Sequence, residues 1–145
     1  MTDEAAAPPR VVTVLLVDDH AVVREGCRRL LECGDDIRVI AEAGTGEDGC
    51  RLFESHRPDV VVMDVGLPGI AGIEAARRIL ARDSAARILM FSMHEDVVFS
   101  SRALQVGARG YVTKSSASDV LTEAVRVVAD GRLYISREMA QELAV

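Results

Sequence analysis

Five short runs of Val, Ile and Leu, each followed by a segment with helical periodicity, constrain the fold of this chain more than any other feature. They span residues 11–17, 37–41, 59–63, 87–91 and 109–113. Each run is too short for a buried helix and rich in β-branched residues, so each predicts a strand. The first, third and fourth lack polar alternation. This pattern is typical of central strands in a parallel sheet that helices cover on both faces.

Helices are predicted after each strand, at residues 20–33, 46–56, 72–82, 95–106 and 117–130. Two of them begin with capping signals, because Thr45 with Asp48 and Ser116 with Asp119 have the spacing of residues that cap helix N-termini. The acidic residues at 95–96 suit the first turn of a helix. Five successive βα units predict an α/β fold with a doubly wound parallel sheet and right-handed crossovers.

The totals suit one globular domain that does not itself grip nucleic acid. The chain has 145 residues, of which 49% are hydrophobic, so it can bury a core. The net charge of -6 argues against direct binding to a phosphate backbone, which needs clustered Lys and Arg. No apolar stretch reaches the length of a membrane span. Three cysteines without a CxxC pair predict reduced thiols in a cytoplasmic protein.

Both ends of the chain are expected to lie outside the main domain, which we place at residues 11–131. Residues 1–10 are acidic and have no apolar signal core, so they predict a short disordered lead. Residues 132–145 begin another helix at Ser136, with Met139 on its apolar stripe. This segment is either the start of a linker helix to an output domain absent from the chain or a terminal helix docked on the same domain. The residues support both equally.

Reactive side chains stand at the carboxyl ends of four of the five predicted strands. In an open α/β sheet, ligands bind at this edge, where the strand order reverses. The second strand exits into Ala43 and Gly44, which carry no reactive group. With the strand order 2-1-3-4-5, the other four strands are neighbours. Their ends would then bring together Asp18, Asp19, Asp64, Ser92 and Lys114.

Asp64 ends an apolar run and precedes Gly66 and Pro68, which turn the chain away and leave the carboxylate open to a ligand. Three carboxylates at one edge repel each other unless a cation joins them. Mg²⁺ suits such a site because it accepts one or two carboxylates together with a phosphate. Lys114 and Ser92 would contact phosphoryl oxygens. These groups are the parts that phosphoryl transfer needs, and an aspartyl phosphate on Asp64 is the expected product.

Over residues 11–131, the chain resembles a response-regulator receiver domain of bacterial two-component signalling. Four stretches carry the resemblance: LLVDDH, PDVVVMDVGLPGIAG, ILMFSMHED and GARGYVTKSSASDVLTEAV. The resemblance implies a flavodoxin-like (βα)5 fold with strand order 2-1-3-4-5. The SMHED and KSS sequences are most similar to the NarL/LuxR-type subgroup, whose members usually carry a C-terminal helix-turn-helix domain.

The resemblance also implies a role for each acidic residue. Asp64 resembles the phosphoacceptor, and Asp19 resembles a direct Mg²⁺ ligand. Asp18 would hold a water of the ion, and the backbone carbonyl of Gly66 would be a further ligand. Gly66 departs from the family pattern, which often has Asn or another polar residue there, so no side chain at this position contacts the phosphate or an incoming water. We therefore expect the rate of dephosphorylation to be affected.

Three further residues are assigned to the switch by the same resemblance. Ser92 takes the place of the switch hydroxyl, Lys114 that of the phosphate-binding lysine, and Tyr111 that of the rotating aromatic residue. Ser115 replaces the proline that commonly follows the lysine. A cis bond before a residue other than proline costs about 3 kcal/mol, so the residues leave the cis and trans forms of the Lys114–Ser115 bond open.

The implied function is signalling rather than turnover of a separate substrate. A sensor histidine kinase would transfer a phosphoryl group to Asp64, and the domain would catalyse only its own phosphorylation and dephosphorylation. The altered surface would pair two receivers as a homodimer. DNA would be contacted only through the absent output domain, which would control transcription, and no membrane is involved.

Other interpretations remain open at this point. The chain could be a stand-alone receiver or phosphorelay adaptor, an aspartyl-phosphate hydrolase, or a flavin or nucleotide carrier. Gly66 counts against a hydrolase, which needs a second acid there, and no phosphate-cradling Gly-rich loop follows the first strand. Asp19 and Ser92 could simply cap helices, and Tyr111 could be ordinary strand packing. His20 has no partner at ligand spacing in the sequence and is interpreted as a surface or outer-sphere group.

Overall fold

A single parallel sheet of five strands forms the centre of the computed structural model, which describes residues 10–93 and 97–143. The strands are β1 (Val12–Val17), β2 (Ile37–Ala43), β3 (Val60–Asp64), β4 (Ile88–Ser92) and β5 (Gly110–Thr113). Their order is β2-β1-β3-β4-β5, and all four neighbouring pairs are parallel. This arrangement confirms the predicted doubly wound α/β fold.

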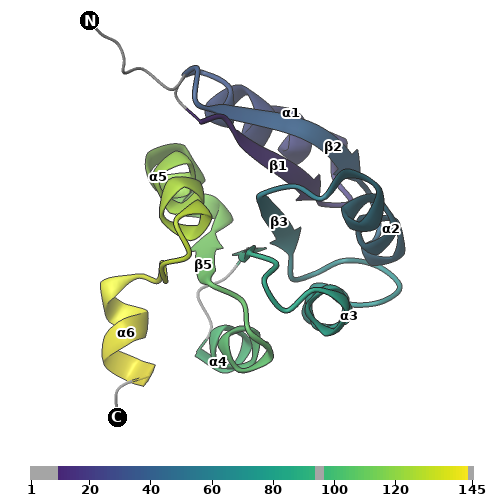
Figure 1. Ribbon diagram of the computed structural model, residues 1–145. Helices are drawn as coiled ribbons and strands as arrows, with labels where there is room; N and C mark the ends of the chain where they lie inside the picture. The colour runs from purple at the N-terminus through teal and green to yellow at the C-terminus, as the bar shows by residue number, and fades with distance from the viewer. Residues whose placement is uncertain (1–9, 94–96, 144–145) are drawn as a thin grey trace, which may run out of the picture.

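Helices cover both faces of the sheet, as Figure 1 shows. They are α1 (Ala21–Leu31), α2 (Gly46–His56), α3 (Gly72–Arg82), α4 (Val97–Val106), α5 (Ala117–Ala129) and α6 (Arg137–Leu143). Helices α1 and α5 pack against each other on one face, whereas α2, α3 and α4 form a consecutive layer on the other. Within the described part of the chain, every helix is too short or too polar to cross a bilayer.

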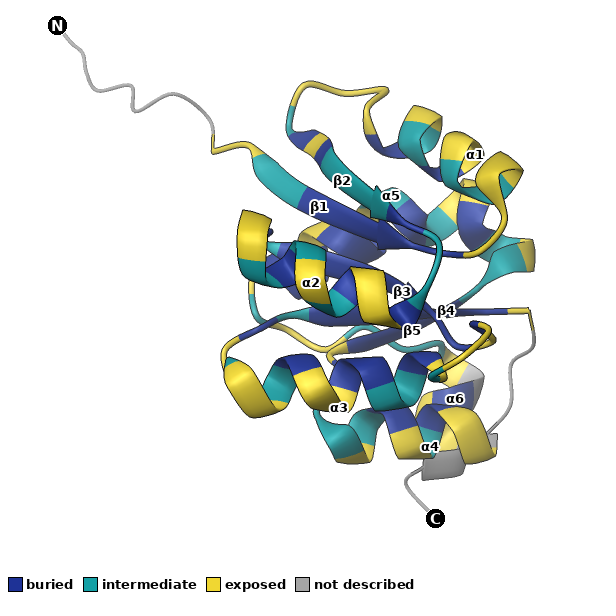
Figure 2. Cartoon of the chain, turned by 90° about the vertical axis from the view of Figure 1, so that its right-hand side faces the viewer, coloured by how far each residue is buried: buried dark blue, intermediate teal, exposed yellow. Residues whose placement is uncertain are grey.

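The strands are buried on both sides because neighbouring residues point into two separate cores. In β1, Leu15 and Val17 contribute to the core under α2, α3 and α4, while Val14 and Leu16 contribute to the core under α1 and α5. All five residues of β3 and of β4 are buried, and Figure 2 shows these strands in dark blue between helices with exposed outer faces. This is the reason why the sequence of these strands lacks polar alternation.

Local signals placed most element ends to within one or two residues. The Thr45 hydroxyl accepts a hydrogen bond from the Asp48 amide at 3.1 Å, as predicted for the start of α2. Helix α5 begins directly after Ser116, as predicted, but the Ser116 hydroxyl lies 2.7 Å from the Thr113 hydroxyl and makes no hydrogen bond to the first turn of the helix. Strand β2 runs to Ala43, two residues beyond the predicted end. Residues 1–9 of the predicted lead at 1–10, and the acidic start of a helix at 95–96, lie outside the described residues.

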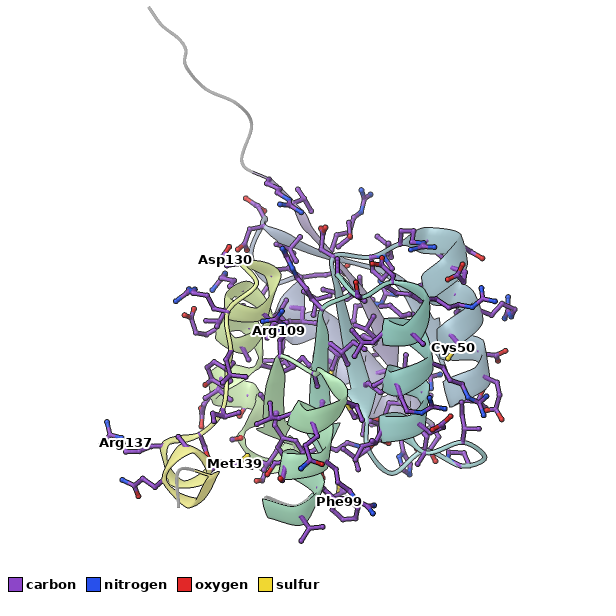
Figure 3. All side chains as sticks on the ribbon, turned by 60° about the horizontal axis from the view of Figure 1, so that its bottom comes forward. Cys50, Phe99, Arg109, Asp130, Arg137 and Met139 are labelled. Atoms are coloured by element: carbon purple, nitrogen blue, oxygen red, sulfur yellow. The ribbon has the colours of Figure 1, made fainter. Side chains whose placement is uncertain are left out.

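The segment after α5 packs on the domain beside β5 and α4. Tyr134 exchanges backbone hydrogen bonds with Arg109 and Tyr111 of the β5 region, at 2.8 and 3.0 Å. Helix α6 follows with a cap from the Ser136 hydroxyl, and its Met139 is only 2% exposed. In Figure 3, Met139 lies toward the domain whereas Arg137 projects away from it. The docked arrangement is therefore present, and the role of this segment as a linker stays a prediction.

Gly72, the first residue of α3, allows that helix to pack against the end of β3. A methyl group on its Cα atom would lie 1.9 Å from the backbone carbonyl oxygen of Asp64. Gly26 in the middle of α1 has no atom within 4 Å of the same position. The two glycines are therefore a matched pair of helical sites, one crowded by backbone and one open.

We expect Gly72→Ala to lower the free energy of unfolding by about 1–3 kcal/mol, because the backbone of β3 must shift to relieve the overlap. Gly26→Ala should raise it by roughly 0.5–1 kcal/mol, because alanine is the better helix former. Urea unfolding followed by circular dichroism measures both changes. Equal effects of the two substitutions would contradict the packing described here.

Candidate functional site

The carboxyl edge of the sheet holds a cluster of acidic side chains at the ends of two adjacent strands. Asp64 is the last residue of β3, Asp18 directly follows β1, and each is 4% exposed. Asp19 is exposed beside them. One ligand atom from each of these residues and from His20 lies within 4.8 Å of all the others. The predicted convergence of the acidic residues is thus present in the structure.

Lys114 joins the two buried carboxylates. Its Nζ atom lies 2.7 Å from Asp18 Oδ2 and 3.4 Å from Asp64 Oδ2, and its side chain is only 11% exposed. The Lys114 ammonium group also lies over the ring of Phe91 in β4, with Nζ 5.5 Å from the ring centroid. Lys114 begins a single 3-10 turn, Lys114–Ser116, directly after β5. No peptide bond in the described residues is cis, so the Lys114–Ser115 bond is trans.

Two kinds of interaction act on the protonation of the site. Burial raises the pKa of the Asp64 carboxyl above its ordinary value, and the charge of Asp18 adds to this increase, while the hydrogen bond from the Gly66 amide and the Lys114 ammonium oppose it. Burial alone would lower the pKa of Lys114, but its contacts with Asp18 and Asp64 outweigh that effect and raise it. The lysine therefore stays charged between the two acids.

The chain after Asp64 turns back over its own carboxylate. The Gly66 amide donates a hydrogen bond of 3.1 Å to Asp64 Oδ1, which fixes the rotation of the carboxylate. Gly66 is exposed, and a Cβ atom there would lie 3.9 Å from the same oxygen, which is an ordinary contact distance. A side chain at position 66 would thus stand at the mouth of the site, as expected from the sequence.

Ser92 lies on β4, the strand next to Asp64, and Tyr111 lies on β5, one strand farther away. The strand register pairs Asp64 with Phe91, so Ser92 follows at the end of β4, and it is 6% exposed. Tyr111 of β5 pairs with Met90 of β4. It is 2% exposed and belongs to the core under α2, α3 and α4. Residues 94–96, which separate Ser92 from α4, are outside the described residues, and so is the cap that Ser92 could have formed.

The donor set fits a hard divalent cation. The three carboxylates and one ammonium carry formal charges of −3 and +1, which leaves −2 for the cation to balance. The buried Oδ2 atom of Asp18 has no well-aligned hydrogen bond in the described part of the chain, although Lys114 Nζ is close to it. Carboxylate oxygens are ligands that Mg²⁺ accepts, and this cluster offers several of them close together.

Two further residues contact this cluster, His20 and Arg24, and Glu42 in turn holds Arg24; sequence reasoning did not single out Arg24 or Glu42. His20 was interpreted as a surface or outer-sphere group, and its exposed ring does lie beside the acids, with Nδ1 3.3 Å from Asp18 Oδ1 and 3.2 Å from Asp19 Oδ1. Arg24 donates a short hydrogen bond to the backbone carbonyl of Asp18, and Glu42 in β2 accepts from Arg24 at 3.0 Å. The spacing of His20 and Arg24, four residues apart at the start of a helix, is the one signal that could have placed both side chains on the same side.

The acidic cluster does not lie in the groove between α2 and α3. That groove has a volume of about 520 Å³ and is lined by Cys50, Phe53 and several arginines. Its guanidinium groups are paired with acidic residues of α2 and α3, such as Arg77 and Arg78 with Glu74 and Arg82 with Glu54. Figure 3 shows Cys50 there, on the α2 side of the domain.

Comparisons with known proteins agree with this geometry. The response regulator receiver domain family matches residues 14–126. The chain is 39% identical over 135 residues, or 93% of its length, to the response regulator UvrY of Escherichia coli K12 and to the response regulator GacA of Pseudomonas aeruginosa. It spans 62% of the length of UvrY and 63% of that of GacA.

A solved structure of a LuxR-family two-component response regulator from Aurantimonas sp. SI85-9A1 superimposes with a TM-score of 0.88 at 47% identity. The alignment covers 92% of this chain and 96% of that one. Receiver domains of this family are signalling modules rather than classical enzymes. The fold, the acidic cluster at its carboxyl edge and these relatives together show that the chain belongs to the response regulator receiver domain family, of the NarL/LuxR type.

Proposed function

We propose that Asp64 accepts a phosphoryl group from the phosphohistidine of a sensor histidine kinase. The observation that carries this proposal is the position of its carboxylate, at the end of a fully buried strand and within reach of Lys114. In the transfer, an Asp64 oxygen forms the new bond to phosphorus as the phosphorus–nitrogen bond of the donor breaks. The imidazole leaves with the electron pair and takes up a proton.

The neighbouring residues would prepare this step. The Gly66 amide holds Asp64 Oδ1, so that the carboxylate keeps one orientation. Asp18 and Asp19, with Asp64 and the Gly66 backbone carbonyl, would hold Mg²⁺. When bound, the ion neutralises the charge that gathers on the phosphoryl oxygens. Lys114 already lies between the acids and would move its ammonium group onto one of those oxygens.

The new phosphoryl group would change the surface formed by α4, β5 and α5, through Ser92 and Tyr111. Ser92 donates its hydroxyl hydrogen to a phosphoryl oxygen, and Tyr111 turns into the space that this movement leaves. Tyr111 is packed in the core next to the α4 layer, so its movement would rebuild the face of α4, β5 and α5. This is a shift between two packings of one fold.

Such a change of surface would pair two receivers as a homodimer. An output domain beyond the segment at 132–145 would then place two DNA-binding units on adjacent half-sites and regulate transcription. These events belong to the cytoplasm, where the kinase presents its phosphohistidine. The names of the relatives, which are response regulators and include a LuxR-family member, support this reading.

Asp64→Asn should abolish phosphorylation by acetyl phosphate with Mg²⁺, because the amide lacks the nucleophilic oxygen. Intact mass spectrometry should show one added phosphoryl group on the natural chain and none on the variant. Asp130→Asn is the matched control, since Asp130 is an exposed aspartate with a side chain 68% accessible at the far end of α5. Labelling of the Asp64→Asn chain would rule out the assignment.

Mg²⁺ alone should stabilise the folded protein, because the ion binds the folded acidic cluster and relieves its repulsion. At a concentration of one hundred times Kd, the expected gain is about 2.7 kcal/mol. Thermal unfolding with and without Mg²⁺ measures it, and EDTA should reverse it. Asp19→Asn should lose most of the gain while folding normally. If Mg²⁺ stabilised Asp19→Asn as much as it stabilises the natural chain, the ion would bind elsewhere.

Lys114 is the single lysine in the sequence, so reductive ¹³C-methylation labels only this side chain and the N-terminal amine. Its methyl resonance should move when Asp64 is phosphorylated, because the ammonium group exchanges the Asp18 carboxylate for a phosphoryl oxygen. The Asp64→Asn chain treated in the same way should show no change. A Lys114 resonance unaffected by full phosphorylation would contradict the proposed switch.

A further inference from the structure

We propose that Arg24, anchored by Glu42, is a positioning residue for the acidic pair. Resting on the proposed function, this inference assigns a task to two residues outside the site itself. Arg24 lies in the first turns of α1, and Glu42 lies near the end of β2. Together they form a strut from the second strand to the loop that carries Asp18 and Asp19.

The guanidinium group of Arg24 binds two different acceptors. Its Nε atom donates to Glu42 Oε1 at 3.0 Å, and one terminal nitrogen donates to the backbone carbonyl oxygen of Asp18. The Arg24 side chain is only 20% exposed and that of Glu42 only 28% exposed. The planar guanidinium can hold both acceptors in a fixed relation, which a single ammonium group cannot do.

The Asp18 carbonyl is a sensitive point because it belongs to the peptide unit that joins the two acids. This unit is planar, so fixing its oxygen restricts the orientation of the residues on both sides. The Asp18 amide is held by the Ala43 carbonyl at 3.0 Å, and Asp18 Oδ1 accepts from the His20 amide at 2.8 Å. Arg24 supplies the remaining restraint, on the carbonyl.

Glu42 keeps the arginine in place as a charged anchor. Burial would raise the pKa of Glu42, but the hydrogen bonds from Arg28 and Arg24 outweigh it and lower the pKa. Glu42 is therefore ionised at neutral pH. Its two oxygens are divided between the two arginines, with Oε1 bound by Arg24 and Oε2 by Arg28.

Arg28 provides a control that the chain itself contains. It lies one turn after Arg24 on α1 and binds the same carboxylate, at 2.6 and 2.9 Å. Its other contacts are the Val39 carbonyl at 3.4 Å and Glu32 at 3.6 Å, both away from the acidic pair. Loss of Arg28 removes a salt bridge to Glu42 but leaves the Asp18 carbonyl bound by Arg24.

The test is the Mg²⁺ affinity of the 145-residue chain, measured by isothermal titration for the natural sequence, Arg24→Ala, Arg24→Lys, Glu42→Gln and Arg28→Ala. Substitution of a residue that orients metal ligands typically lowers the affinity for the metal by 10–100-fold. We expect Arg24→Ala to raise the Kd for Mg²⁺ about tenfold. The Kd of Arg24→Lys should be close to that of Arg24→Ala. The Kd of Glu42→Gln should lie between those of Arg24→Ala and the natural chain, whereas Arg28→Ala should keep the Kd of the natural chain. Urea unfolding of each variant records its stability separately.

Several outcomes would overturn the inference. If Arg24 acted only through its charge, Arg24→Lys would bind Mg²⁺ like the natural chain, and Arg24→Ala would bind it more tightly. If the strut were merely structural, Arg24→Ala and Arg28→Ala would lose stability to a similar extent with no difference in Kd. Should the natural chain bind no Mg²⁺, the proposed function itself would fail, and this inference with it.

Discussion

Like charges forced together at the end of two buried strands are the constraint on which the rest of this structure depends. Two carboxylates 4 Å apart repel each other by about 4 kcal/mol at the effective dielectric constant of a protein surface. Here Asp18 and Asp64 are both buried, Asp19 lies beside them, and one ammonium group compensates part of their charge. The fold holds these groups in place because β1 and β3 are fixed on both faces by the two cores.

This balance is suited to a switch because Lys114 is shared. Its ammonium contacts Asp18 and Asp64 at the same time, so any group that adds charge to Asp64 competes for it. Lys114 follows β5, where Tyr111 is packed and where the Tyr134 segment adds its backbone hydrogen bonds. The backbone therefore connects Lys114, which contacts the acidic cluster, directly to the strand β5 that lies in the surface made by α4, β5, α5 and α6.

The architecture and most of the candidate site could be predicted from the sequence because their signals are local. Buried parallel strands require uninterrupted apolar runs, and polar residues directly after those runs mark the functional edge. The remainder depends on contacts between distant segments. Strand β2 was expected to end at residue 41, yet it continues through Glu42, whose carboxylate is held by arginines of α1. His20, Arg24 and the Thr113–Ser116 hydroxyl contact could not be placed without the loop geometry.

The central claim is that Asp64 is the one residue of the acidic cluster that carries the phosphoryl group. Borohydride reduces an acyl phosphate of aspartate to homoserine, so the phosphorylated position can be read by peptide mass spectrometry. Treatment with acetyl phosphate and Mg²⁺ should leave homoserine at position 64 and unmodified aspartate at positions 18 and 19. Homoserine at position 18 or 19, or a phosphoryl group on His20, would contradict the account.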